Sequence, residues 1–156
     1  MLSVMTTTIQ GIAGLKDLVG QHLGYSDYVE ITQEQVNLFA DATGDHQWIH
    51  VDVERAKAES PFGGPIAHGY LTLSLGPALA PQIMRVDGIK MGVNYGADKV
   101  RFPAPVPVGS KVRLGAQLDA VDDIAGGAQV HMTFTYECEG APKPSCVAQI
   151  IFRYYV

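Results

Sequence analysis

The sequence lacks several features on which large classes of protein depend. It has only two cysteines, Cys138 and Cys146, which are too few for a disulfide scaffold and are not spaced as metal ligands. No run of about 18 apolar residues occurs, so we expect no membrane-spanning helix. Lysines and arginines are scattered singly and the net charge is -5, which argues against nucleic acid as a partner. These absences favour a cytoplasmic protein.

The N-terminus also lacks the pattern of a secretory signal. The stretch MLSVMTTTIQ has no basic region followed by a long apolar run. We therefore expect residues 1–14 to be a flexible segment and residues 15–156 to form a single domain. A chain of 156 residues is an ordinary size for one domain, and 47% hydrophobic residues are enough to build a core.

The C-terminal half alternates between apolar and polar residues, which is typical of strands with one buried face. The alternation runs through residues 112–120, 130–138 and 146–154, with turn-forming residues between these segments. A further strand is expected within GVNYGADKVRF, where Gly96 is a candidate for a bulge. With a first strand at residues 25–31, the pattern predicts an antiparallel five-stranded sheet.

One segment of the N-terminal half is apolar on nearly every side. Residues 66–84 read IAHGYLTLSLGPALAPQIM, and a helix without a polar face is a buried one. Pro77 and Pro81 each remove a helical hydrogen bond, so we expect a kink or an end in its second half. The sequence therefore predicts an α+β fold, with the sheet wrapped around a long central helix. Open sheet edges favour edge-to-edge pairing of two copies, which predicts a homodimer.

A shorter helix is delimited by its cap signals. Thr32 and Gln35 form a capping box, and Gly44 stands where a glycine ends a helix. The loop that follows carries Asp45 and His50, five residues apart. In a tight loop their side chains can converge, and a carboxylate and an imidazole sharing one water form a general acid–base pair. The simpler alternative is that Asp45 caps the next turn and His50 is a half-buried loop residue.

The start of the central helix is a second place where chemistry could be carried. The first amides of a helix have no helical acceptor and carry positive partial charge. Gly69 would let a ligand approach closely, so its amide could hold a carbonyl oxygen that gains negative charge. The alternative is that Gly69 only permits the helix to pack closely on the sheet.

These segments together resemble the MaoC-like family of R-specific enoyl-CoA hydratases. ATGDHQWIHVD is followed after a short alanine-containing segment by IAHGYLTLSL, and residues 94–113 resemble the strand and turn that come next in the family. The family signature is matched at five positions: Gly44, Asp45, Ile49, His50 and Ala56. The resemblance covers residues 16–156 and implies the hot-dog fold, which agrees with the arrangement expected from the pattern of apolar residues.

The resemblance also implies a reaction, the reversible addition of water to a trans-2-enoyl-CoA to give an (R)-3-hydroxyacyl-CoA. It implies His50 as the base, Asp45 as the acid, and the Gly69 amide as the oxyanion donor. The residues alone do not decide which member of the pair takes which role. No metal or other cofactor is implied, because coenzyme A is part of the substrate.

The signature is broken at two positions, and the substrate contacts are less well marked. Gln47 replaces an asparagine and Trp48 replaces a proline, so Gln47 is expected to orient the loop and Trp48 to narrow the pocket or anchor the loop. Basic side chains at the site are expected to meet the coenzyme A phosphates, and apolar ones the acyl chain. The candidates for substrate binding are Gln47, Trp48, Phe62, Tyr70, Lys99 and Arg101. The alternative for each of them is an ordinary surface or core residue with no role in binding.

Three other functions stay open at this point. A dehydratase acting on acyl-carrier-protein thioesters would need a basic surface near the site, and the scattered charge here disfavours it. A non-catalytic acyl-binding subunit of the same fold would be expected to lack the acid or the base. A hot-dog thioesterase would release free thiol, which a hydratase does not.

Overall fold

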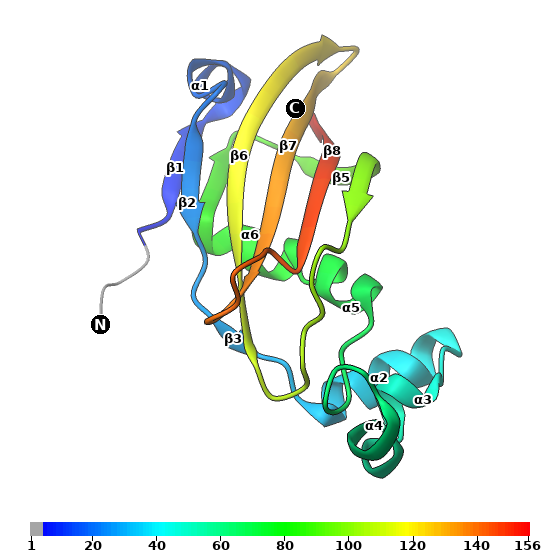
Figure 1. Cartoon of the computed structure of the whole chain (residues 1–156). Helices are drawn as coiled ribbons and strands as arrows, with labels where there is room; N and C mark the ends of the chain where they lie inside the picture. Colours follow the sequence, from blue (N-terminus) through cyan, green and yellow to red (C-terminus); the bar gives the residue numbers. More distant parts are fainter. Residues whose placement is uncertain (1–4) are drawn as a thin grey trace.

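The fold is built on an antiparallel sheet whose long strands come from the C-terminal half of the chain (Figure 1). The computed structural model describes residues 5–156. The long strands, in spatial order from the middle to one edge, are β6 (Lys111–Ile124), β7 (Gly127–Cys138), β8 (Cys146–Tyr155) and β5 (Met91–Arg101). The expected alternation is confirmed along the whole of β7, whereas β6 and β8 depart from it at Gly115 and Ile151, which are buried next to buried neighbours.

The opposite edge of the sheet differs from the expected single strand at residues 25–31. Two short strands, β2 (His22–Tyr25) and β3 (Val29–Glu30), both pair with β6, so the sheet has six strands rather than five. The two short strands are separated after Tyr25, where the Ser26 side-chain oxygen accepts a hydrogen bond from the Leu114 amide at 2.9 Å. On β5, the predicted bulge at Gly96 is confirmed by a shift in register between Asn94 and Gly96.

The central helix consists of two consecutive helices, α5 (Gly69–Ser74) and α6 (Gly76–Ile83), that pack on the sheet. The predicted long helix is thus interrupted, at Leu75. Pro77 has no N–H to donate to the Leu73 carbonyl, and that carbonyl instead accepts a hydrogen bond from the buried Tyr136 hydroxyl at 2.7 Å. Strand β7, which carries Tyr136, therefore supplies the hydrogen-bond donor that Pro77 lacks. Pro81 lies inside α6.

The expectation of a flexible segment at residues 1–14 is wrong for most of its described part. Strand β1 (Thr7–Gln10) pairs in parallel with β4 (Met84–Asp87), and helix α1 (Gly11–Asp17) follows it. Ile9 is buried in the core, which gives this segment a reason to be fixed. Residues 1–4 lie outside the described residues, so the prediction stays untested there.

The remaining helices lie together at one end of the molecule (Figure 1). They are α2 (Gln33–Thr43), α3 (Trp48–Val51) and α4 (Val53–Glu59). Both predicted caps of α2 are confirmed, because Thr32 accepts from the Gln35 amide and Gly44 adopts a left-handed conformation with φ of 85°. The helix therefore ends directly before Asp45. Within residues 5–156, no helix is long and apolar enough to cross a membrane.

Candidate active site

The loop between α2 and α4 brings Asp45 and His50 together. One potential ligand atom of each of Asp45, His50 and His68 lies within 4.8 Å of the other two. The glycine stop at Gly44 turns the chain out of α2, and the single turn of α3 then returns His50 toward the start of α5. The convergence that a tight loop allows is therefore present, and a second histidine joins it.

His50 is buried and has a defined orientation. Its Nδ1 lies 2.6 Å from the Ile66 carbonyl oxygen, and because a carbonyl can only accept, Nδ1 carries the hydrogen. The other nitrogen, Nε2, is left with a lone pair. Burial lowers the pKa of His50 below its ordinary value, and the neighbouring His68 adds to this effect. This combination suits an imidazole that acts as a base near neutral pH.

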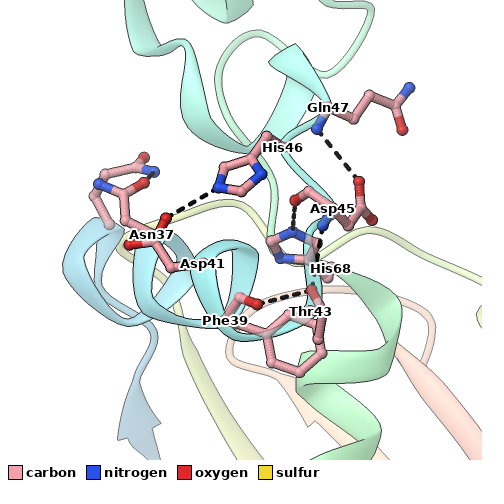
Figure 2. Close-up of polar contacts among 9 residues, drawn as sticks. Asn37, Phe39, Asp41, Thr43, Asp45, His46, Gln47 and His68 are labelled. Carbon is pink, nitrogen blue, oxygen red and sulfur yellow. Dashed lines mark hydrogen bonds and ion pairs between the residues drawn. The ribbon is translucent and has the colours of Figure 1, made fainter.

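Asp45 is exposed, and two hydrogen bonds hold its loop conformation in addition to the bond from its own amide to Thr43 Oγ1 at 3.4 Å (Figure 2). Its Oδ1 accepts from the Gln47 amide at 3.3 Å, and its main-chain carbonyl accepts from His68 Nε2 at 3.0 Å. The first bond agrees with the simpler alternative, in which Asp45 caps the next turn. The two readings are compatible, because capping engages one carboxylate oxygen and holds the side chain close to His50.

A cavity of about 330 Å³ has His50 and Gly69 in its wall, whereas Asp45 is not part of that wall. Gly69 is the first residue of α5, so its amide has no helical acceptor. A Cβ at this position would lie 3.1 Å from two ring carbons of Phe102, which also lines the cavity. The short distance to Phe102 therefore supports the alternative in which Gly69 permits close packing. Because Gly69 has no side chain, its backbone itself lines the cavity.

Two polar residues of the site were missed as candidates from the sequence. Ser145, just before β8, is buried in the cavity wall, and its hydroxyl has no hydrogen-bond partner within residues 5–156. His68 is buried against His50, with ring centroids 4.0 Å apart. The sequence signal for His68 was its position next to Gly69. Nothing in the local pattern singles out Ser145, which reaches the site only through the pairing of β8.

Only one of the six candidates for substrate binding lines this cavity. Phe62 lines the cavity, whereas Gln47, Trp48, Tyr70, Lys99 and Arg101 are not part of its wall. Trp48 packs under the Arg55 guanidinium at 4.3 Å from the ring centroid, which agrees with a loop anchor. Tyr70 is 70% exposed, and Arg101 is exposed but directly precedes Phe102 in the cavity wall. Roles for these residues in substrate binding stay predictions.

The only grouping within residues 5–156 that offers three metal-ligand side chains is Asp45, His50 and His68. Its two imidazoles are stacked with 24° between their planes, so their lone pairs do not point toward a common centre. The site is thus better arranged for proton transfer than for holding a metal ion. The expectation that no metal takes part stays a prediction.

Comparison with known proteins gives one consistent result. The family model described as a MaoC like domain matches residues 15–140. The 3-hydroxyacyl-thioester dehydratase Z of Mycobacterium tuberculosis is 56% identical over 148 residues, covering 94% of this chain and 97% of that protein. Nodulation protein N of Rhizobium meliloti is 46% identical over 149 residues, with 90% and 88% covered.

A solved structure supports the fold. The unliganded R-hydratase PhaJ1 from Pseudomonas aeruginosa superimposes with a TM-score of 0.73 over 93% of this chain and 85% of that chain, at 23% identity. At this level of identity the likeness concerns the fold alone. It confirms the predicted hot-dog arrangement of a sheet around a central helix.

Proposed function

We propose that this chain, which belongs to the MaoC-like dehydratase family, is an R-specific enoyl-CoA hydratase. It would add water reversibly to a trans-2-enoyl-CoA and give an (R)-3-hydroxyacyl-CoA in fatty-acid metabolism. The observation that carries the proposal is the convergence of the Asp45 carboxylate with His50, whose Nε2 is left bare beside a cavity. A relative named for dehydration of 3-hydroxyacyl thioesters supports the substrate class.

The orientation of His50 supports its assignment as the base. A water placed between His50 and Asp45 would lose one proton to His50 Nε2 while its oxygen bonds to C3 of the enoyl thioester. Asp45, which starts this scheme as the carboxylic acid, would deliver its proton to C2, and transfer of the water-derived proton from His50 to the resulting carboxylate would reset the pair. The water is thereby divided between C3 and C2, and the protein has no net gain or loss of protons.

The negative charge that develops on the thioester oxygen needs a donor. The Gly69 amide is the candidate, because it is free of helical bonding and its residue lines the same cavity as His50. No step of this scheme requires a metal or redox cofactor. Lys99 and Arg101 are proposed to meet the coenzyme A phosphates, since both are exposed on β5, whose end leads into the cavity wall at Phe102.

A homodimer is part of the proposal. Strand β5 is an edge strand that exposes three large apolar side chains, with Met91 at 55%, Val93 at 37% and Tyr95 at 56%. A long apolar edge of this kind is covered in most proteins that remain unaggregated. A second copy pairing along β5 would cover it. Light scattering of the purified protein would give the mass of a dimer, and Val93→Lys would shift it toward the monomer.

The carrier-protein dehydratase is the second candidate, because the thioester dehydratase relative is not named for a particular thiol carrier. The test is to mix the purified protein with crotonyl-CoA and with a longer trans-2-enoyl-CoA, and to follow the loss of the conjugated thioester absorbance. The proposal expects absorbance loss, an (R)-3-hydroxyacyl product and no free thiol with a thiol-reactive dye. Turnover only with carrier-protein substrates would favour the second candidate, and free thiol would indicate a thioesterase.

A further inference from the structure

We propose that His68 is a positioning residue that holds Asp45 and His50 in one working arrangement, through its ring N–H and its flat face. The kinetic effects expected from this inference rest on the proposed function, whereas the contacts that support it do not. His68 is 3% exposed and is the residue that precedes α5, so the fixed central helix carries it. Of the pair that it contacts, Asp45 lies in the loop after α2 and His50 lies in α3, where its ring is also held by the Ile66 carbonyl.

The two contacts made by His68 reach the two members of the pair separately. Its Nε2 donates to the Asp45 carbonyl at 3.0 Å, which attaches the loop next to its exposed carboxylate (Figure 2). Its ring stacks on the His50 ring, with centroids 4.0 Å apart and 24° between the planes. Phe39 of α2 lies against the His68 ring, at 4.9 Å between centroids. His68 therefore contacts α2, the Asp45 loop and α3 at once.

The hydrogen-bond partners require the two stacked histidines to carry their hydrogens on different nitrogens. Both partners are carbonyls, which only accept, so His50 carries its hydrogen on Nδ1 and His68 on Nε2. His68 Nδ1 is buried and has no hydrogen-bond partner within residues 5–156. Its lone pair therefore serves no structural bond, and the side chain acts through its N–H and its face.

This combination of contacts explains why a histidine suits the position. An aromatic residue without a donor would keep the stack and lose the bond to Asp45, and an amide would keep the bond and lose the stack. Small displacements matter here, because misplacing a reacting group by about 1 Å can cost about 100-fold in rate. A residue that fixes both members of the pair is thus worth a large factor in turnover without touching the substrate.

The first experiment separates the two contacts by substitution. His68→Phe keeps a flat ring and His68→Gln keeps a donor, and each is expected to lower kcat by about 10- to 100-fold while KM changes less than about threefold. His46→Gln is the matched control, because this exposed histidine follows Asp45 in the chain but its side chain bonds to Asp41 instead. It is expected to stay within about twofold of the wild type.

A pH profile supplies a readout that a purely structural role would not move. Asp45, from the loop after α2, and His68, from the start of α5, are the titratable groups whose charges act on His50. His68 lowers the pKa of His50, so His68→Phe is expected to move the acid limb of kcat/KM to higher pH. Two variants with kcat within twofold of the wild type and an unmoved acid limb would overturn the proposal.

The second experiment needs no substrate and uses the unmodified protein. Long-range ¹H–¹⁵N spectra of the histidine side chains are expected to show hydrogen on Nδ1 of His50 and on Nε2 of His68. Hydrogen on Nδ1 of His68 would contradict the bond to Asp45 and overturn the proposal even if every variant failed to fold. If no enoyl thioester is hydrated but the two tautomers are as expected, the proposed function fails and the arrangement around His68 stands.

Discussion

Two cavities lie beside the same central helices and differ in chemistry. The larger, of about 470 Å³, is bordered by α6 and by strands of the sheet, and Lys90 is the only charged residue in its wall. The smaller, of about 330 Å³, adjoins the start of α5 and contains His50, Ser145 and the backbone of Gly69. Volume alone would favour the larger cavity. The convergence of groups able to move protons is what distinguishes the smaller one.

The difference has a structural cause. Most of the wall of the larger cavity comes from α6 and from strands, and several of its side chains are apolar core residues. The smaller one is bordered by the ends of helices and strands, since α5 starts at Gly69, β5 ends just before Phe102 and β8 begins just after Ser145. Backbone amides and polar side chains are left unpaired at such ends. The site therefore lies where regular structure is interrupted.

The strongest test of the difference between the two cavities is to disable one of them at a time. Asp45→Asn and His50→Gln are each expected to lower kcat by about 10²- to 10⁴-fold, because each removes one proton-transfer group. Lys90→Gln, the matched change in the larger cavity, is expected to leave kcat within about twofold. The measurement is the initial rate of enoyl-thioester absorbance loss. A Lys90 variant as impaired as the other two would place the chemistry in the larger cavity.

A smaller effect is expected at the start of α5. Gly69→Ala would put a methyl group 3.1 Å from the Phe102 ring, and the ring would have to move within the cavity. We expect kcat to fall about tenfold, since the oxyanion position would shift relative to the pair. Gly64→Ala is the control, because a Cβ there meets no atom within 4 Å. Equal rates for the two variants would show that the contact with Phe102 does not set the oxyanion position.

Ser145 offers a finer test of which polar groups in the cavity contact substrate. Its buried hydroxyl has no protein partner within residues 5–156, so we expect it to bond to the substrate or to the reacting water. Ser145→Ala should lower kcat/KM by about 3- to 10-fold, the size of one hydrogen bond of about 1 kcal/mol. Ser74→Ala, whose hydroxyl bonds to the Tyr70 carbonyl, should change it little. The steady-state kinetics of both variants would decide this.

The smallest expected effect is a displacement of the pH profile. His50 must be neutral to act as a base, and burial lowers its pKa, so it stays neutral to a lower pH than a free imidazole. The acid limb of kcat/KM should therefore have its midpoint below about pH 6.5, the ordinary value. A midpoint above that value would mean that His50 is not buried as described or is not the base.

The sequence was sufficient where the signals are local. The alternation in β7 and the caps of α2 each depend on residues close in the chain, and both are confirmed. The family, the fold and the hydro-lyase class expected from the resemblance are also confirmed. The Gly44 stop placed Asp45 in a loop, which is why its convergence with His50 could be anticipated.

The sequence was insufficient where distant segments meet. The regular structure of residues 7–14 depends on pairing with β4. The presence of two edge strands in place of one depends on the hydrogen bond between Ser26 and Leu114. Ser145 is brought to the site by β8, far along the chain from the Asp45 loop. None of these contacts has a periodic signature, because each is decided by tertiary packing.

In the proposed reaction, Asp45 and His50 act as one unit on one water. The most direct measurement is kcat/KM for the two single variants, Asp45→Asn and His50→Gln, and for the double variant, with the same enoyl thioester. Groups that act together are strongly non-additive, so the account predicts a double variant about as slow as the slower single variant. A double variant whose loss is the product of the two single losses would show independent action and contradict it.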